Sequence, residues 1–232
     1  YWQQANVETA LAKVNGPATK TVDTAMYVGR IPTHFGHFLL EGLPRLCDAT
    51  SLNIPIIGYI TDGFLPEGIV ATPREEIEWA IRSVTSSSFL TMQEEDVFSV
   101  KNLLVPALPI KLSHSCAEPW RMTPMIQKLI KKARSENKDI KKSIWGLYLR
   151  RAGEDDIREE CDGYVLSDPS EKFSRQIARV SYAPKLMGVT GSNTHLSMFA
   201  PASCETMWFS RGDSQQGDRN QLICDLIRTY NT

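Results

Sequence analysis

The sequence lacks the signatures of several common protein classes. It contains no GxGxxG and no GxxxxGK(S/T) stretch, so dinucleotide-dependent oxidoreductases and P-loop enzymes lack their main evidence. No apolar run approaches the roughly 20 residues that cross a bilayer. An excess of one charge is also missing, because 26 basic residues face 27 acidic ones and leave a net charge of −1. Binding to the backbone of nucleic acids needs a clear basic excess, so nucleic acid is not the expected ligand.

Cysteine is scarce and widely spaced. No CxxC pair occurs, so neither a zinc ribbon nor a disulfide scaffold is indicated. The five cysteines are Cys47, Cys116, Cys161, Cys204 and Cys224. No usable Asn-x-Ser/Thr site occurs either, because Asn193-Thr194 is followed by a histidine. These absences favour a cytoplasmic protein, either free or peripheral at the inner face of the membrane. The chain begins with Tyr1 rather than Met, so we expect a piece of a longer protein, and a targeting or membrane segment outside it stays open.

What is present is an ordinary globular composition with alternating strand and helix patterns. The 232 residues are 42% hydrophobic, enough for one large α/β domain or two small ones. Residues 25–106 read as a βαβαβ-β pattern, and residues 143–230 alternate in the same way. A proline-rich connection at 106–124 and a basic helix at 123–137 lie between them. We therefore expect two α/β halves, residues 1–115 and 143–232, joined by residues 116–142.

The first candidate site is His34-x-x-His37-x-x-x-Glu41, after a short strand at 25–29. On a helix these positions share a face, so the side chains could bind a metal. Alternatively, His37 and Glu41 could act as a base and the group that orients it. In the simplest interpretation His34 only caps the helix and His37 alone faces a cleft. Pro44 predicts a kink or break near Glu41.

The second candidate is Arg150-Arg151, which ends the strand-like stretch 143–151. The planar guanidinium group matches phosphate oxygens, so two of them at a strand's carboxyl end suit a diphosphate. The alternative is that both arginines pair with acids that follow in the sequence. These acids are Glu154, Asp155 and Asp156.

The third candidate is the stretch Lys185–Phe199, read as an apolar strand, a small-residue turn and a helix start. A helix start after such a turn presents backbone N–H groups and partial positive charge to an anion. His195 on its first turn could donate to that anion. The alternative is an ordinary helix capped by Asn193 or Thr194.

Together these stretches resemble the family 61 glycosyltransferases, which include capsular-polysaccharide enzymes. The resemblance rests on four segments in order between residues 34 and 209. They are His37-Phe38-Leu39-Leu40-Glu41-Gly42-Leu43-Pro44-Arg45-Leu46; Leu147-Tyr148-Leu149-Arg150-Arg151 with the acidic run Ile157-Arg158-Glu159-Glu160; Gln176-Ile177; and Ala183 to Phe199. The last segment departs from the family pattern, because Thr190-Gly191-Ser192 stands where His-Gly-Ala is frequent.

The resemblance implies a GT-B-like pair of Rossmann-like halves with a cleft between them, the N-terminal half being minimal or truncated. It implies an inverting, metal-independent transfer from a nucleotide-sugar to a glycan, a lipid-linked acceptor or another hydroxyl, with no further cofactor. The donor diphosphate would then contact Arg150, Arg151 and a turn formed by Gly191, Ser192, Asn193, Thr194 and His195. His37 would act as the base, with Glu41 as its orienter or alternate.

Two other functions stay open at this point. A metal-dependent hydrolase could use His34, His37 and Glu41, although their spacing is not that of the known zinc-hydrolase motifs. A non-catalytic sugar- or nucleotide-binding module is the other alternative, because the chain is short. The donor sugar, the acceptor, the linkage and the oligomeric state are not determined by the sequence.

Overall fold

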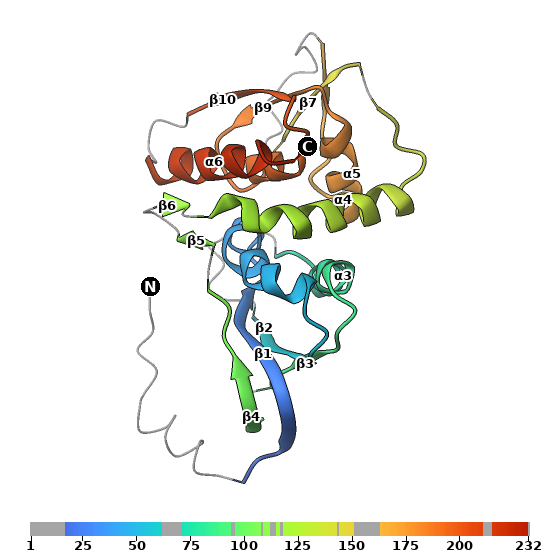
Figure 1. Cartoon of the computed structure of the whole chain (residues 1–232). Helices are drawn as coiled ribbons and strands as arrows, with labels where there is room; N and C mark the ends of the chain where they lie inside the picture. Colours follow the sequence, from blue (N-terminus) through green and yellow to red (C-terminus); the bar gives the residue numbers. More distant parts are fainter. Residues whose placement is uncertain are drawn as a thin grey trace.

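The computed structural model describes residues 17–61, 71–93, 96–107, 109–111, 115–116, 118–142, 144–150, 163–210 and 215–231. Its regular elements form two four-stranded parallel sheets with helices between and around them (Figure 1). This is an α/β protein whose halves are compatible with Rossmann-like units. Within the described ranges, no helix is long and apolar enough to cross a membrane.

The N-terminal sheet has the strand order β3-β2-β1-β4, and all its neighbouring strands are parallel. Its strands are β1 (Lys20–Pro32), β2 (Ile56–Thr61), β3 (Phe89–Thr91) and β4 (Phe98–Leu104). The helix α3 (Arg74–Val84) connects β2 to β3. It follows Thr72-Pro73 and has Glu75 and Glu76 in its first turn, which together are a helix-start signal in the sequence. The predicted βαβαβ-β pattern is therefore confirmed. The strand expected at 25–29 is longer than its apolar run, because polar residues at its start also pair with β4.

The segment after β1 changes helix type twice. One α turn, α2 (Phe35–His37), leads into a π turn, η1 (Phe38–Gly42), and then into a 3₁₀ helix, η2 (Leu43–Thr50). The single helix expected here is therefore irregular, and the break falls next to Pro44 as predicted. The apolar side chains expected on one face are buried, Phe38, Leu39 and Leu43 among them. A π turn widens the helix by one residue and frequently marks a functional site.

The C-terminal sheet has the order β10-β9-β7-β8 and is also parallel throughout. Its strands are β7 (Gly146–Tyr148), β8 (Tyr164–Leu166), β9 (Lys185–Val189) and β10 (Glu205–Phe209). The helices are α5 (Phe173–Tyr182), the 3₁₀ helix η4 (Thr194–Phe199) and α6 (Gln215–Arg228). Over the described residues, the predicted alternation of strands and helices in this half agrees with the structure. The stretch 153–161, where a loop and a short helix are expected, lies outside them. The strand expected at 143–151 is shorter, as β7, and the closing helix expected at 220–230 is α6, which begins earlier.

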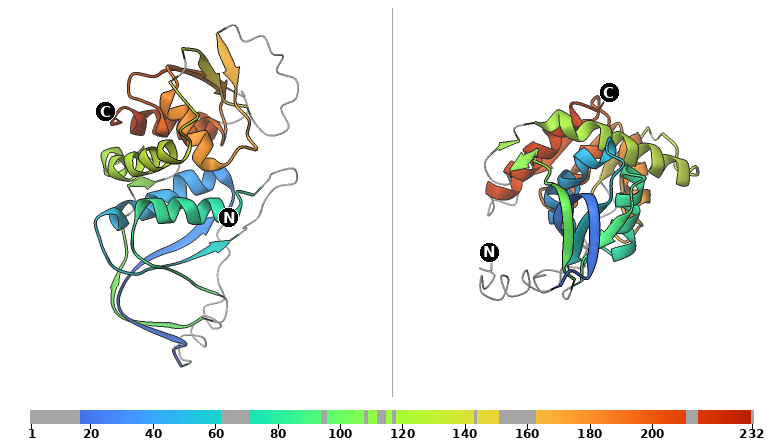
Figure 2. Two further views of the ribbon diagram at one scale, coloured as in Figure 1. Left: turned by 90° about the vertical axis from the view of Figure 1, so that its right-hand side faces the viewer. Right: turned by 60° about the horizontal axis from the view of Figure 1, so that its bottom comes forward.

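The helix α4 (Thr123–Glu136) lies between the two sheets and packs against both α3 and α5 (Figures 1 and 2). Before it, the stretch predicted as a plain loop contains the 3₁₀ helix η3 (Pro119–Met122) and a small antiparallel pair, β5 (Ile110–Lys111) and β6 (Ser115–Cys116). Pro119 begins η3, a position where proline is favoured, so the proline content of this stretch does not indicate a loop by itself. The helix predicted at 123–137 is α4, with Pro124 in its first turn.

One continuous buried core runs through both halves. Phe173 at the start of α5 is its centre, with edge-to-face ring contacts to four aromatic side chains from both halves. These are Phe35, Phe38, Trp79 and Phe199. The backbone N–H of Phe173 also donates to Glu76 of α3 at 3.1 Å. The boundaries at residues 115 and 142 stay a prediction, and the described halves share the buried aromatic contacts of Phe173.

Candidate functional site

The two sheets meet at the carboxyl ends of their strands. In open α/β sheets, ligands bind beyond these ends, where the strand order reverses. The reversals lie between β1 and β4 and between β7 and β9. A Cβ added to Gly36, in the turn after β1, would lie 2.5 Å from the Ser192 Oγ, in the turn after β9. We call this contact between residues 34–41 and residues 190–195 the sheet junction.

His34 begins the N-terminal side of the junction and acts as the helix cap. Its side chain accepts a hydrogen bond from the His37 backbone N–H at 3.4 Å. The two imidazole rings meet edge to face, with centroids 4.8 Å apart. The capping interpretation of His34 is therefore confirmed. Within the described ranges, no three side chains of His, Cys, Asp or Glu are grouped as metal ligands.

His37 and Glu41 form the chemical pair that the sequence predicted. The π turn brings the two side chains together, and His37 Nδ1 is hydrogen-bonded to Glu41 Oε1. The His37 side chain is 55% exposed and the Glu41 side chain 34% exposed, so the pair is accessible. Burial raises the pKa of Glu41, but the bond to His37 and the nearby Arg30 and Arg45 outweigh it and lower the pKa. Glu41 is therefore an ionised carboxylate that holds the imidazole by one nitrogen and leaves Nε2 for another partner.

A glycine and an arginine hold the helical segment on β1. Gly29 has a φ of +69° at a register shift between β1 and β2. This φ favours glycine, and an added Cβ would also lie 3.3 Å from the Arg45 guanidinium, a tight contact. The guanidinium makes a long hydrogen bond, 3.5 Å, to the Val28 carbonyl. Arg45 thus ties the segment to the sheet.

On the C-terminal side, the turn Thr190–His195 is held by its own polar side chains. The Thr194 hydroxyl donates to the Gly191 carbonyl at 2.8 Å and accepts from the Gly191 N–H at 3.1 Å. The Asn193 amide donates to the Leu149 carbonyl at the end of β7. The predicted capping of a helix by Asn193 or Thr194 is not found, because Thr194 closes the turn and Asn193 bonds to Leu149 instead.

The helix expected after this turn is a 3₁₀ helix of six residues, η4. A helix this short carries little macrodipole, so the predicted charge at its start is not a strong anion site. Within the described ranges, the backbone N–H groups of Ser192 and Asn193 have no hydrogen-bond partner. Two adjacent free donors are still able to bind an anion.

His195 is the most strongly perturbed group at the junction. It is 5% exposed, and neither ring nitrogen has a hydrogen-bond partner in the described part of the chain. Burial, reinforced by the neighbouring His34 and His37, lowers its pKa to about 4. The imidazole is therefore neutral at neutral pH and offers one donor and one acceptor rather than a positive charge.

Arg150 follows β7 and lies on the same edge of the sheet. Its backbone N–H donates to the Ser167 Oγ, after β8, at 2.9 Å. Its buried Nε has no hydrogen-bond partner, and its guanidinium forms no ion pair with any described residue. Arg150 as a whole is partly buried, and after the hydrogen bonds from Ser170 it helps to lower the pKa of nearby Asp168. A buried Nε that pairs with no described residue is costly without a partner, so this side chain suits an anionic ligand. Arg151 and the acidic stretch after it lie outside the described residues.

Sequence patterns did not indicate several residues that shape the sheet junction and the carboxyl edge of the C-terminal sheet. Gly36 provides the space for Ser192, and its position between two histidines in a first helical turn is the signal that could have identified it. Asp218 of α6 accepts hydrogen bonds from the hydroxyls of Thr190 and Ser210, at 3.0 and 2.8 Å, and so fixes the ends of β9 and β10. No short-range pattern predicts a contact between side chains this far apart in the chain.

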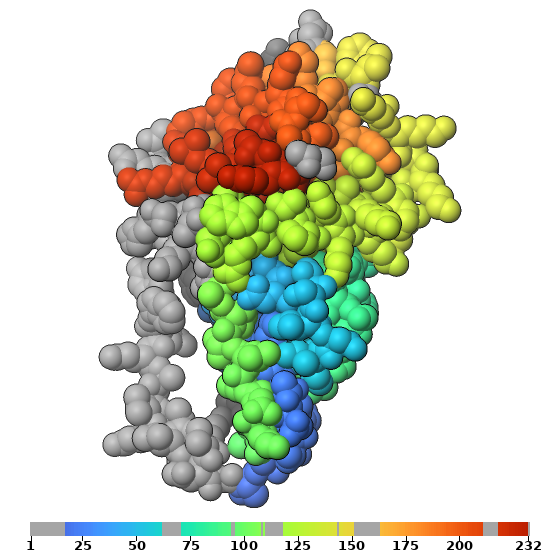
Figure 3. Space-filling model, in the orientation of Figure 1, coloured from blue at the N-terminus to red at the C-terminus, as the bar shows by residue number. Residues whose placement is uncertain are grey.

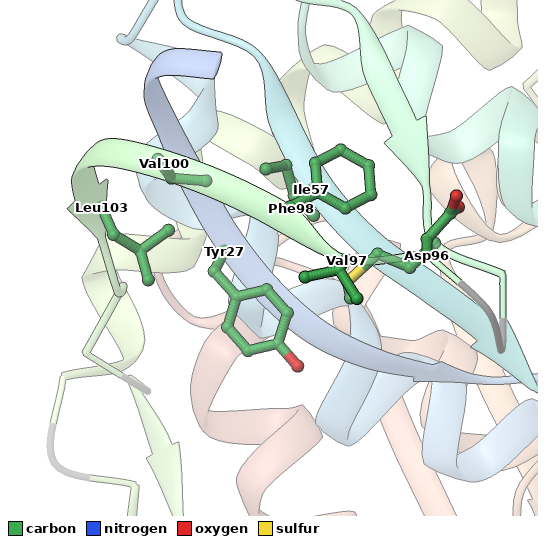
Figure 4. A pocket seen from close by; sticks show the side chains of 8 residues that line it. Tyr27, Ile57, Asp96, Val97, Phe98, Val100 and Leu103 are labelled. Carbon is green, nitrogen blue, oxygen red and sulfur yellow. The ribbon is translucent and has the colours of Figure 1, made fainter. Parts of the chain in front are cut away.

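Away from the junction, the N-terminal sheet carries a groove of about 270 Å³ (Figure 4). Its walls are mostly apolar side chains of three strands, Tyr27, Ile57, Phe98, Val100 and Leu103 among them. None of the predicted site residues lines it. The groove is therefore separate from the chemical groups described above.

Comparison with known protein families decides the class. A family model described as Glycosyltransferase 61 matches residues 35–207. The chain belongs to glycosyltransferase family 61. The resemblance seen in the sequence is thereby confirmed, and the protein is an enzyme that transfers a sugar to an acceptor. The matched region contains all the predicted site residues from His37 to His195, and the hydrolase alternative is not favoured. No curated protein and no solved structure matches the chain.

Proposed function

We propose that this family 61 glycosyltransferase uses a nucleotide-sugar donor and inverts the anomeric centre in a single displacement, without a metal. The acceptor is the hydroxyl of a glycan or of a lipid-linked glycan. The observation that supports the proposal is the sheet junction. There an accessible His37–Glu41 pair lies near a turn whose Ser192 and Asn193 N–H groups have no partner among the described residues. Arg150, whose Nε has no partner in the same part of the chain, follows β7 at the same edge of the C-terminal sheet. The halves then act as a GT-B-like pair, with the division near residues 115 and 142.

The donor diphosphate binds on the C-terminal side in this proposal. Arg150, joined by Arg151, supplies the positive charge, and the N–H groups of Ser192 and Asn193 bind phosphate oxygens. Gly191 and Thr194 keep the turn in shape. His195 contributes a neutral hydrogen bond, because its pKa of about 4 leaves it without charge at neutral pH.

The acceptor hydroxyl binds on the N-terminal side, at the free Nε2 of His37. As its oxygen attacks the anomeric carbon, the bond from that carbon to the diphosphate breaks and the hydroxyl proton passes to His37. Glu41 orients the imidazole and stabilises the imidazolium that forms. The charge that develops on the leaving diphosphate is neutralised by Arg150 and the turn. A cytoplasmic location, free or at the inner membrane face, belongs to the same proposal.

A thermal-shift screen against nucleoside diphosphates and nucleotide-sugars, with a chelator present, tests this function. We expect at least one nucleotide to raise the melting temperature, because a ligand that binds the folded state stabilises it. Arg150→Ala should remove that shift. Arg82→Ala is the matched control, because Arg82 is 66% exposed on α3 and pairs only with Glu78. If no nucleotide shifts the melting temperature, or only a metal restores the shift, the proposal is wrong. Donor binding without transfer to any acceptor would favour a non-catalytic module.

A further inference from the structure

The outward face of α6 is apolar, which is unusual for a helix on the surface. Between residues 218 and 231 the inward side is buried, through Ile223, Cys224 and Ile227. The outward side carries Leu222, which is 69% exposed, and Leu226, which is 41% exposed. A surface helix normally presents charged or polar side chains there.

The apolar face of α6 extends onto the neighbouring 3₁₀ helix η3. Trp120 is 51% exposed, and its ring meets that of Tyr230, itself 40% exposed, edge to face at 6.4 Å. Positions 222 and 226 are one helical turn apart on α6, and Tyr230 lies in the turn that follows the helix, so the three side chains and Trp120 form one patch. We call these four residues the α6 patch. Contiguous exposed patches of this kind mark interaction sites.

The α6 patch carries no carboxylate. The nearest acids of α6 turn away from it: Asp225 accepts from the Trp208 Nε1 at 2.8 Å, and Asp218 holds the turns after β9 and β10. Arg219, an exposed residue, is the charged side chain on the outward side of α6. The patch is therefore bordered by positive charge along α6. Beside Trp120, the carboxylates of Glu118 and Asp48 are both paired with Arg121 at 2.8 Å.

The neighbouring helix α4 adds a basic surface. In Figures 1 and 3, α6 in red and α4 in green lie side by side on one face of the molecule. Lys131 is exposed on α4 and forms no ion pair with any described residue, whereas Lys132 pairs with Glu136. Three further exposed lysines follow in the connection to β7, again without ion pairs to the described residues. They are Lys138, Lys141 and Lys142.

We propose that the α6 patch, together with Lys131 of α4 and the lysines of the connection to β7, docks this protein onto an anionic phospholipid surface. Leucines enter the boundary between headgroups and acyl chains, while Trp and Tyr rings lie at headgroup depth. The lysines attract the anionic headgroups beside them. Charge complementarity selects this occupant, because a second copy would bring the same basic face against itself. The inference does not depend on the proposed donor or on the His37–Glu41 chemistry.

Co-sedimentation of the whole chain with vesicles tests the proposal. Binding to vesicles that contain phosphatidylglycerol should exceed binding to pure phosphatidylcholine, and it should weaken as salt rises. Leu222→Ser should weaken binding about tenfold, because an apolar side chain no longer enters the lipid. Lys131→Glu should weaken it at least about fivefold, because attraction to the headgroups becomes repulsion.

Two exposed positions on β4 supply matched controls. Leu103→Ser changes a leucine that is 51% exposed, and Lys101→Glu changes a lysine whose side chain is 77% exposed. Both should leave vesicle binding unchanged. All four substitutions are at exposed positions, so an unchanged melting temperature confirms folding. The absence of binding to anionic vesicles, or equal binding by Leu222→Ser, would overturn the proposal. A dimer in light scattering that Leu222→Ser dissociates, without vesicle binding, would assign the face to a second copy instead.

Discussion

The buried imidazole of His195 makes a quantitative prediction about stability and pH. Burial and the neighbouring His34 and His37 lower its pKa from 6.5 to about 4. Between these values the unfolded chain binds a proton that the folded protein does not. The contribution of His195 is therefore fully present above about pH 6.5 and is lost as the pH falls towards 4. Between pH 7 and pH 5 the linkage amounts to about 2 kcal/mol.

The test is urea denaturation of the wild type and of His195→Gln at both pH values. Glutamine does not titrate, so the variant should lose about 2 kcal/mol less than the wild type over that interval. Its cost as a buried polar group is independent of pH and cancels in the difference. An imidazole titration by NMR gives the same pKa independently. Equal pH dependence in the two proteins, or a measured pKa near 6.5, would refute the electrostatic description of the junction.

Two further predictions concern packing, and urea denaturation measures both. Gly36→Ala should destabilise the protein, because its Cβ would meet the Ser192 Oγ at 2.5 Å, and adding Ser192→Gly should restore most of the loss. No recovery would show that the junction is not closed as described. Phe173→Ala should cost about 3–5 kcal/mol in one cooperative transition, whereas Val165→Ala, at a position 49% exposed, should stay within about 0.5 kcal/mol. Separate transitions for the two halves would contradict the continuous core.

Much of the fold was predictable because its signals are local. The apolar strands and the Thr72-Pro73 start of α3 carry their own hydrophobic pattern or start signal, and these predictions agree with the structure. The pairing of His37 with Glu41 was also accessible, since i and i+4 positions meet on a helix. The break next to Pro44 follows from the missing N–H and the ring of proline.

The other features of the fold and the candidate site depend on contacts between residues far apart in the chain, which local sequence patterns do not reveal. The sequence of η4 resembles the start of an α-helix. In the structure, however, the Thr194 hydroxyl bonds to Gly191 and closes the turn, and the Asn193 amide bonds to Leu149. The low pKa of His195 arises from burial against a segment more than 150 residues earlier in the chain. Gly36 was overlooked for the same reason, because its role appears only when Ser192 lies opposite.

Donor affinity and transfer rate, measured on the same variants, test the central claim most directly. Once the thermal-shift screen has identified a donor, Arg150→Ala should weaken its binding about tenfold or more, as loss of a charged hydrogen bond does. His37→Ala should leave donor affinity unchanged and lower the transfer rate at saturating donor by about a hundredfold or more, because a general base is missing. A His37→Ala protein that transfers sugar at the wild-type rate would contradict the assignment of the acceptor side. An Arg150→Ala protein with unchanged donor affinity would contradict the assignment of the donor side.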